Sequence, residues 1–334
     1  MGTQPATSAV PLQTGVPGRL ELLQAYAQML LIRRFEEEVQ RRFLKGEVHG
    51  TTHLCNGQEA IAVGVAAGMK DRDLLAATYR GHGHALARGL DPGGLATELM
   101  GRVGGTCAGR AGSMNVLAPE QGLIGCFGIV GGSIGAATGA ALALRGSGRI
   151  AVACFGEGAT NQAYFAECLN FAKVLSLPLL LVCENNGYGE FTAWEAVTAG
   201  ADIQARVQAL AVPAQRIDGN DVLAVHDATQ RAATVVRGGG GPAFLEMLTY
   251  RQVGHSRSDP GNYRPSGELE QWLLRDPLRF ARSAIEQQGL ADARALARLQ
   301  DSVEQDVRAA FERAAASPFP DPAELAAASE YCDA

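Results

Sequence analysis

The segment IAVACFGEGATNQ, residues 150–162, narrows the possible folds of this chain more than any other. Its apolar half is typical of a buried strand, and the strand stops at Glu157, which stands between Gly156 and Gly158. NQAYFAECLNFAKVL then predicts a helix, and PLLLVCE, residues 178–184, predicts a second strand. Strand–helix–strand order with nearly continuous apolar strands indicates an α/β fold with a mostly parallel sheet and helices on both faces.

The same alternation continues toward the C-terminus. DVLAVHDATQRAATVVR predicts a helix that ends at the glycines of residues 238–241, and PAFLEMLTY predicts a further strand. Apolar residues at helical spacing predict helices over residues 20–44, 56–69 and 93–101.

The domain organisation follows from these elements. We expect one α/β domain over residues 20–267, because no repeat, low-complexity block or linker interrupts it. Residues 1–19 are rich in Pro, Gly, Thr and Ser and predict a flexible N-terminal arm. Residues 268–334 predict a helical extension packed on the same domain.

Composition excludes several classes of partner. The 334 residues are 47% hydrophobic with a net charge of −6, which argues against nucleic acid and against anionic membranes. The seven cysteines form no C-x-x-C pair, and no signal or transit peptide is apparent, so we expect a cytoplasmic protein. Residues 122–144 are uncharged but consist mostly of small residues, so we expect a buried, tightly packed helix and no membrane span.

Polar motifs follow the predicted strands at the edge where parallel sheets bind ligands. These motifs are GEGATN, ENNGYGEF and YRQVGHSRSDPGNYR. Gly156 and Gly158 allow close backbone approach, and the following helix start favours phosphate. Glu157 and the Asn185–Asn186 pair supply oxygen ligands of the kind that Mg²⁺ prefers. The motifs together predict a cradle for a magnesium diphosphate.

Other interpretations of these motifs exist. GEGATNQ departs from the dinucleotide pattern G-x-G-x-x-G at Gln162, and no phosphate-binding G-x-x-x-x-G-K-[ST] loop is present. Glu157 can instead be a helix-start acid, and the two asparagines can be turn formers. The histidines of HGH can be hydrogen-bonding loop residues, and we expect no zinc there because no third ligand has suitable spacing.

A family resemblance rests on several motifs in one order. GEGATN, followed by one helix, one strand and ENNGYG, resembles the thiamine diphosphate signature. HLCNGQEAIAVG, TYRGHGHALARG, CAGRAGSMNV, GIVGG and GHSRSDPGNYR extend the likeness from about residue 20 to residue 280. Over this range the chain resembles the alpha subunit of the thiamine diphosphate-dependent first component of 2-oxo acid and acetoin dehydrogenase complexes.

The resemblance implies a thiamine diphosphate-binding fold and a set of site residues. The residues that would hold Mg²⁺ are Glu157, Asn186 and the carbonyl of Tyr188. Those that would contact or flank the diphosphate are Gly158, Ala159, Tyr79, Arg80 and Arg251. Those that would meet the aminopyrimidine through backbone groups are Gly128 and Val130, and the catalytic residues at the thiazolium would be His53 and His255.

The resemblance also implies an activity and partners. The expected function is oxidative decarboxylation of a pyruvate-type 2-oxo acid with acyl transfer to a lipoyl carrier. The alternatives are acetoin cleavage, a branched-chain substrate, and a catalytically inactive alpha-like scaffold or regulatory subunit; a nucleotide-dependent oxidoreductase is disfavoured. A separate beta subunit would supply the glutamate that activates the aminopyrimidine, in an α2β2 heterotetramer that serves a lipoyl-bearing acyltransferase.

The sequence departs from the family pattern at several positions. Glu157 replaces the commoner aspartate, Asn115 stands where relatives usually carry histidine, and RQVGHS lacks the aromatic–His pair of many pyruvate enzymes. SDPGNYR favours pyruvate, whereas YRGHGHALARG and NNGYGEF favour acetoin-type enzymes. We therefore expect a small substrate, either pyruvate or acetoin.

Overall fold

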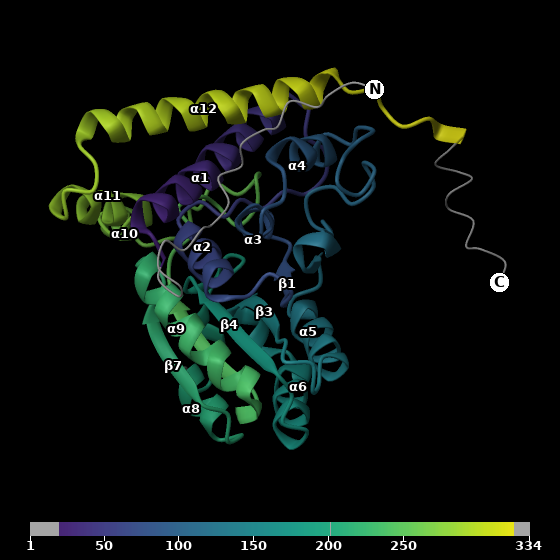
Figure 1. Cartoon of the computed structure of the whole chain (residues 1–334), viewed down its shortest axis with the longest axis vertical. Coiled ribbons are helices and arrows are strands. Elements are labelled where there is room, and N and C mark those ends of the chain that lie inside the picture. Colours follow the sequence, from purple (N-terminus) through teal and green to yellow (C-terminus); the bar gives the residue numbers. More distant parts are fainter. Residues whose placement is uncertain (1–19, 201, 324–334) are drawn as a thin grey trace.

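Six parallel strands form the central sheet of the computed structural model, which describes residues 20–200 and 202–323 (Figure 1). Their order is β2-β1-β3-β4-β8-β7, and each neighbouring pair is parallel. The strands are β1 (Leu74–Thr78), β2 (Leu123–Phe127), β3 (Ala151–Gly156), β4 (Leu179–Asn185), β7 (Ala214–Asp218) and β8 (Ala243–Leu248). The α/β class with a mostly parallel sheet is confirmed.

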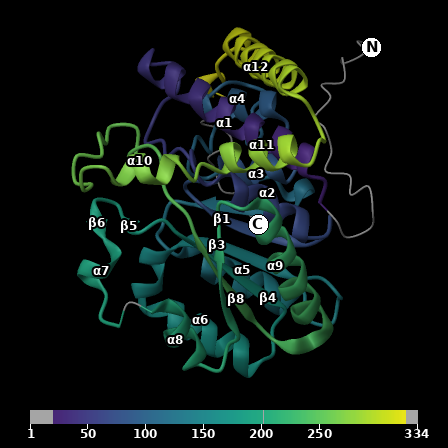
Figure 2. The ribbon, with the colours of Figure 1, turned by 90° about the vertical axis from the view of Figure 1, so that its left-hand side faces the viewer.

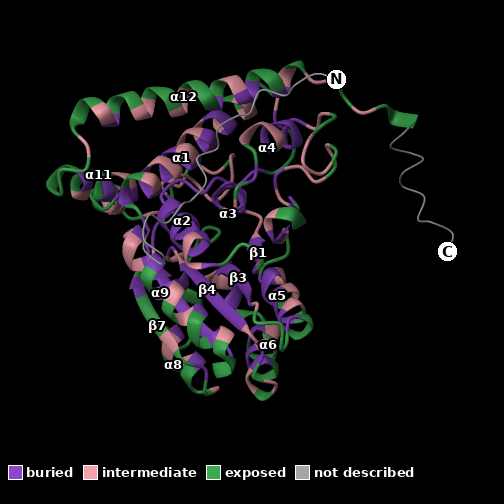
Figure 3. Ribbon diagram, viewed as in Figure 1, coloured by how far each residue is buried: buried purple, intermediate pink, exposed green. Residues whose placement is uncertain are grey.

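Helices cover both faces of this sheet because alternate strand residues point to opposite sides. Val152 and Cys154 of β3 join the core beneath α1 (Leu22–Leu44), α2 (Glu59–Gly68) and α9 (Val222–Val235). Ala153 and Phe155 join the core beneath α5 (Gly132–Ala143), α6 (Ala163–Val174) and α8 (Ile203–Gln208). Burial on both sides explains the nearly continuous apolar sequence of β3 and β4, whose ribbons are buried throughout most of their length (Figure 3).

The C-terminal helices lie at one end of the molecule, where α12 stacks across α1 and α4 (Figures 1 and 2). The Phe311 ring on α12 contacts the Phe35 ring on α1, with centroids 5.0 Å apart. Asp276 and Asp292 cap the starts of α11 and α12 through their carboxylates. The elements of this end are α4 (Pro92–Leu99), α10 (Glu268–Leu273), α11 (Pro277–Gln287) and α12 (Ala293–Ala316).

Shorter elements complete the described chain. They are α3 (His82–Ala87), α7 (Trp194–Val197), the two-stranded antiparallel pair β5 (Tyr188–Gly189) and β6 (Thr192–Ala193), and the turns η1 (Pro119–Gln121), η2 (Glu157–Asn161) and η3 (Val236–Gly240). The expected N-terminal arm, residues 1–19, lies outside the described residues.

The prediction of one buried helix over residues 122–144 was wrong in part. The first residues of this segment form β2, and the chain then turns at Gly131, whose φ of 77° is left-handed, before α5 begins. Gly135 and Gly139 on α5 face outward and have open space beside them, so only the opposite face of this helix is buried. Among the described helices, none is long and apolar enough to cross a membrane.

Three strands of the central sheet carried too little sequence signal to be predicted, and the two-residue strands β5 and β6 were not predicted either. β1 and β2 are five residues long, and β2 contains Gly125 in place of a packing side chain. β7 is an edge strand whose AQRID sequence is mostly exposed. The structure confirms the predicted strands near residues 150, 180 and 245. It also confirms the predicted helices that precede these strands and lie between them.

An ion pair ties η3, directly after α9, to the residue before β1. Both Asp73 oxygens accept from the Arg237 guanidinium, at 2.8 and 2.6 Å, and also from the N–H groups of Lys70 and Ile150. Burial alone would raise the pKa of the fully buried Asp73, but these hydrogen bonds lower it below its usual value.

We predict that Asp73→Ala lowers the free energy of unfolding by about 3 kcal/mol or more, because it leaves a charged donor and two N–H groups unpaired. Urea unfolding of both proteins at pH 7 measures this difference. Asp71→Asn, at an exposed neighbouring position, is the control and should change stability by less than about 0.5 kcal/mol. Equal effects of the two substitutions would contradict the prediction.

Candidate functional site

The site residues expected from the sequence follow the carboxyl ends of five neighbouring strands. They are Gly128 and Val130 after β2, Tyr79 and Arg80 after β1, Glu157, Gly158 and Ala159 after β3, Asn186 and Tyr188 after β4, and Arg251 and His255 after β8. Because the strands are parallel, these segments emerge on the same edge of the sheet. His53 comes from the segment that precedes α2 and joins them there.

Glu157 and Asn186 meet at the ends of β3 and β4. The two strands pair with Gly156 opposite Glu184, so the chain leaves both strands at the same level. The Glu157 carboxylate is buried and accepts the N–H of Asn186 at 3.1 Å, and the Asn186 amide oxygen accepts the N–H of Tyr188 at 3.2 Å. A carboxylate and an amide oxygen therefore lie together in a buried corner.

Burial raises the pKa of Glu157 to about 6, and it is opposed by hydrogen bonds from the N–H groups of Glu157 and Asn186 and by the charges of Arg251 and Arg80. A divalent cation at the carboxylate would favour its charged form. The available donors are all oxygens, which suits Mg²⁺. The corner thus fits the metal that the sequence implied.

Two buried arginines lie beside this corner without a carboxylate partner among the described residues. Arg251 donates to the Asn186 amide oxygen at 3.4 Å and to the Glu190 carbonyl at 2.9 Å, while its Nη1 has no partner within the described chain. Arg80 donates to the carbonyls of Leu54 and His255. An unpaired donor on a buried guanidinium is costly, and a phosphate oxygen would satisfy it.

Gly158 and Ala159 form the turn that begins η2. A Cβ atom built on Gly158 would meet only the Gly189 Cα, at 3.7 Å, which is an ordinary contact. The packing of the chain itself therefore does not require glycine at this position. The absence of a side chain there leaves the backbone open to close approach by a ligand.

His53, Tyr79 and His255 form a cluster of rings next to the arginines. The centroid distances are 4.4 Å from His53 to Tyr79, 4.8 Å from His53 to His255 and 5.8 Å from Tyr79 to His255. Burial, followed by the charges of Arg80 and other neighbours, lowers the pKa of His53 to about 3 and that of His255 to about 4. Both imidazoles are therefore neutral at pH 7 in the protein without ligand.

Gly128 and Val130 lie on the same edge but in an exposed segment, and Val130 is 43% exposed. The Val130 carbonyl accepts the Tyr164 hydroxyl, and Asn115 approaches from the other side, with its amide oxygen 3.9 Å from a Cβ atom built on Gly128. Asn115, which replaces the usual histidine, thus faces the segment expected to meet the aminopyrimidine.

A cavity of about 670 Å³ adjoins the corner, because Asn186 and Tyr188 are among the residues that line it. Its lining includes Glu246, Glu268 and Trp272. Several acidic side chains and Arg216 line it together, so the cavity carries charges of both signs, with acids in excess.

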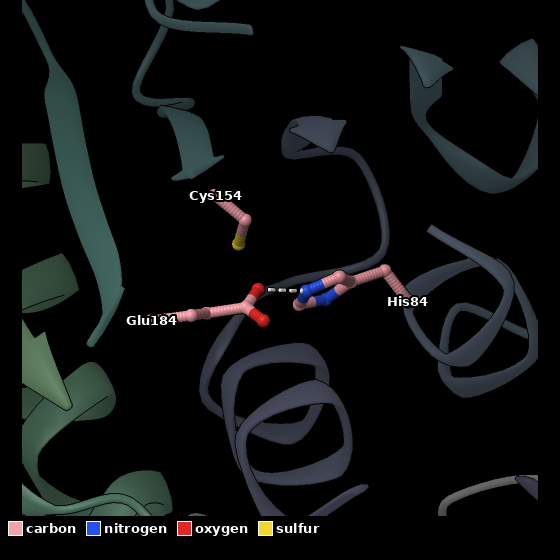
Figure 4. A group of neighbouring side chains, drawn as sticks. All are labelled: His84, Cys154 and Glu184. Atoms are coloured by element: carbon pink, nitrogen blue, oxygen red, sulfur yellow. Dashed lines mark hydrogen bonds and ion pairs between the residues drawn. The ribbon is translucent and has the colours of Figure 1, made fainter. Parts of the chain in front are cut away.

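Sequence reasoning missed a buried cluster of His84, Cys154 and Glu184, shown in Figure 4. Their ligand-type atoms lie within 4.8 Å of one another, so the fold supplies His84 with neighbours that its spacing along the chain did not reveal. His82 is not part of the cluster, because its ring bonds to Glu36 and Ser113. The available signal was the acid Glu184 at the end of an apolar strand, directly before Asn185–Asn186.

The neutral histidines predict a pH dependence of stability. Because the pKa of His53 is depressed in the folded state, the unfolded chain binds more protons between about pH 3 and pH 6.5, and stability falls as the pH drops through this range. We predict that the loss of unfolding free energy from pH 7 to pH 5, measured by urea unfolding without cofactor, is smaller in His53→Gln. An equal loss in both proteins would disprove it.

Comparison with known proteins identifies relatives along almost the whole chain. The family model of the dehydrogenase E1 component matches residues 27–323. The acetoin:2,6-dichlorophenolindophenol oxidoreductase alpha subunit of Bacillus subtilis is 38% identical over 306 residues, which is 91% of each chain. The pyruvate dehydrogenase E1 alpha subunit of Rhizobium meliloti is also 38% identical over 306 residues, covering 91% of this chain and 88% of the relative.

A human relative is similar over nearly the same length of the chain. The somatic, mitochondrial form of the pyruvate dehydrogenase E1 alpha subunit is 36% identical over 319 residues, covering 94% of this chain and 81% of the relative. The matched region contains every element of the sheet and all the site residues described above. The chain therefore belongs to the dehydrogenase E1 component family, whose members depend on thiamine diphosphate, typically with Mg²⁺.

Proposed function

We propose that this dehydrogenase alpha-type chain acts on a small 2-oxo acid of the pyruvate type, as the cofactor-binding half of a two-subunit enzyme. The observation that carries the proposal is the buried corner of Glu157 and Asn186 beside the unpaired guanidinium of Arg251. These groups have the chemistry needed for a metal-bound diphosphate. The rings of His53 and His255 stand beside them.

Each site residue has a proposed role. Glu157, Asn186 and the Tyr188 carbonyl hold Mg²⁺, and the residues at the diphosphate are Gly158, Ala159, Tyr79, Arg80 and Arg251. Arg80 acts on the diphosphate mainly through its charge, because its hydrogen bonds go to the Leu54 and His255 carbonyls. Gly128 and Val130 meet the aminopyrimidine. All of these residues lie in the proposed cofactor-binding domain, residues 20–267. Residues 268–334 are proposed to be an extension of this domain.

Thiamine diphosphate, when bound, supplies the carbon nucleophile that cleaves the bond next to the substrate carbonyl. The protein's part is to orient the cofactor and to move protons at the reacting end. His53 and His255 are suited to the second task, because neutral imidazole can accept a proton at one nitrogen while donating from the other. The crowding of His53, Tyr79, His255 and Phe191 supports a small substrate over a branched one.

The proposed partner is a beta subunit that completes an α2β2 heterotetramer. Ile129, which is 73% exposed, and Val130 are apolar and lie at the proposed aminopyrimidine contact, so a second subunit that covers them would also close the site. The second partner is a lipoyl-bearing acyltransferase that accepts the acyl group. We place the enzyme in the cytoplasm, a reducing compartment, because the described cysteines are all free.

Acetoin is the second candidate substrate. His84, the second histidine of HGH, is buried and bonded to Glu184, and this motif favoured acetoin-type enzymes. We predict faster turnover of pyruvate than of acetoin or branched-chain 2-oxo acids by the chain co-expressed with its beta subunit, measured with an artificial electron acceptor. If the enzyme turned over acetoin and not pyruvate, acetoin would be the substrate and the proposal of pyruvate would be wrong.

The metal role of Glu157 has a direct test. We predict that Glu157→Ala abolishes Mg²⁺-dependent binding of thiamine diphosphate to the alpha–beta pair, measured by calorimetry, because the metal loses its only carboxylate among the proposed ligands. Glu157→Asp keeps the charge and should retain binding within about tenfold.

The same pair of variants separates the enzyme from an inactive scaffold. Turnover by the alpha–beta pair that vanishes in Glu157→Ala excludes the scaffold. Unchanged cofactor binding in Glu157→Ala would refute the proposed metal site.

A further inference from the structure

A row of buried polar side chains runs beneath the proposed metal corner. Gln58 precedes α2, His84 lies on α3, and Glu184 belongs to β4, and each is at most 6% exposed. None of the three is among the residues that the family resemblance placed in the site. The row ends at Asn186, whose amide is a proposed Mg²⁺ ligand.

The hydrogen bonds in this row all point toward Glu184, which accepts from both of its neighbours. Glu184 Oε1 lies 2.5 Å from His84 Nε2, and Glu184 Oε2 accepts from Gln58 Nε2 at 2.6 Å. Gln58 Oε1 in turn accepts from Asn186 Nδ2 at 3.2 Å. The Asn186 amide oxygen accepts from the Tyr188 N–H and the Arg251 Nε.

This direction follows from the carboxylate. An ionised carboxylate can only accept, so Gln58 must present its NH₂ group to Glu184 and its oxygen to Asn186. Asn186 must then donate its own NH₂ group to Gln58, which leaves its oxygen on the side of Arg251 and the Tyr188 N–H. An amide that was free to turn could present either its oxygen or its NH₂ group, and only the oxygen can bind a cation.

We propose that Glu184 and Gln58 form a relay that fixes the amide of Asn186 with its oxygen toward the cation, and that His84 holds the second oxygen of Glu184. All three are positioning residues that act through Asn186. The relay rests on the proposed function, because it assumes that Asn186 is a Mg²⁺ ligand.

The neighbouring asparagine bonds to a different carboxylate and lies outside the relay. Asn185 donates its NH₂ group to Glu246, a buried carboxylate on β8 that also accepts from Arg216. Two adjacent amides are thus oriented by two different carboxylates. Glu246 therefore offers a matched control at an equally buried position.

A metal bound directly by His84, Cys154 and Glu184 is the competing interpretation of the cluster in Figure 4. Both Glu184 oxygens already have partners, and a metal there would have to break the His84–Glu184 contact. The relay uses the contacts as they stand, so the observations favour it.

The test is the isosteric substitution Glu184→Gln, which is expected to reverse the orientation of the amides of Gln58 and Asn186. His84 Nε2 faces residue 184, whereas Nδ1 has no partner in the described chain, so Nε2 carries a proton and donates to residue 184. The amide introduced by the substitution accepts from His84 with its oxygen and presents its NH₂ group to Gln58. The Gln58 amide then turns, and Asn186 in response turns its NH₂ group toward the cation. We expect the Mg²⁺ dissociation constant of the alpha–beta pair with thiamine diphosphate, measured by calorimetry, to rise about 10- to 100-fold.

The exchanged double variant should restore binding. In Gln58→Glu with Glu184→Gln, the carboxylate at position 58 accepts from both the amide at position 184 and Asn186, so Asn186 again turns its oxygen to the cation. We expect its Mg²⁺ affinity to return to within about threefold of the unmodified protein, as a double-mutant cycle detects. A residue with only a packing role would show no such rescue.

Controls separate this relay from misfolding and from failure of the proposed function. Glu246→Gln should leave Mg²⁺ affinity unchanged, and the melting temperature without metal should be similar in all variants. If Glu184→Gln does not fold, Gln58→Met, which removes the acceptor of Asn186, carries the same expectation of weakened Mg²⁺ binding. Glu157→Ala tests the metal site itself.

Three results would overturn the relay while Glu157→Ala still loses Mg²⁺. The first is unchanged Mg²⁺ affinity in Glu184→Gln or, if that variant does not fold, in Gln58→Met. The second is a double variant that binds Mg²⁺ no better than Glu184→Gln. The third is stoichiometric zinc in the purified protein that disappears in Cys154→Ser, since Glu184 would then be a metal ligand.

Discussion

The parallel pairing of β3 with β4 is the constraint on which the site depends. Gly156 stands opposite Glu184, so the two strands end together, and the next residues of each meet as Glu157 and Asn186. Parallel pairing requires α6 to return the chain to the far end of the sheet, which explains the separation of the two motifs along the sequence. β8 pairs on the other side of β4 and carries Arg251 to the same place.

Bringing these strand ends together leaves several charged groups buried without close partners of opposite charge. The carboxylate of Glu157 and the guanidinium groups of Arg80 and Arg251 are buried, and among the described residues none of them forms a close ion pair. Buried carboxylates elsewhere in the same fold have partners within the chain: Asp73 pairs with Arg237, and Glu98 accepts from four backbone N–H groups. A buried carboxylate next to two buried guanidinium groups, one of which has a nitrogen without a partner in the described chain, is typical of a functional site, where a bound ligand supplies the missing partners.

The longer side chain at position 157 is accommodated by the turn that follows β3. Glu157 is the first residue of η2, and its carboxylate reaches across to the N–H of Asn186. The extra methylene relative to aspartate is therefore buried between the two strand ends, where the Glu157 side chain is 1% exposed. Asn115, the other departure from the family, lies near the exposed segment of Gly128 and so belongs to the side of the site that a partner would cover.

The sequence by itself determined the class of the fold and most of the residues that gather at the edge. Apolar periodicity identified β3, α6, β4, α9 and β8, because long buried elements carry a strong pattern. It missed β1, β2 and β7, which are short or exposed at the edge of the sheet, and it merged β2 with α5 because both are uncharged and contain glycine. Only the tertiary structure decided which partners the buried polar groups have: that His84 meets Glu184, that Gln58 meets Asn186, and that Arg251 keeps an unpaired nitrogen. Periodicity reports which face of an element is buried, whereas hydrogen bonds between residues more than 100 positions apart depend on strand order and register, which the pattern of a single element does not encode.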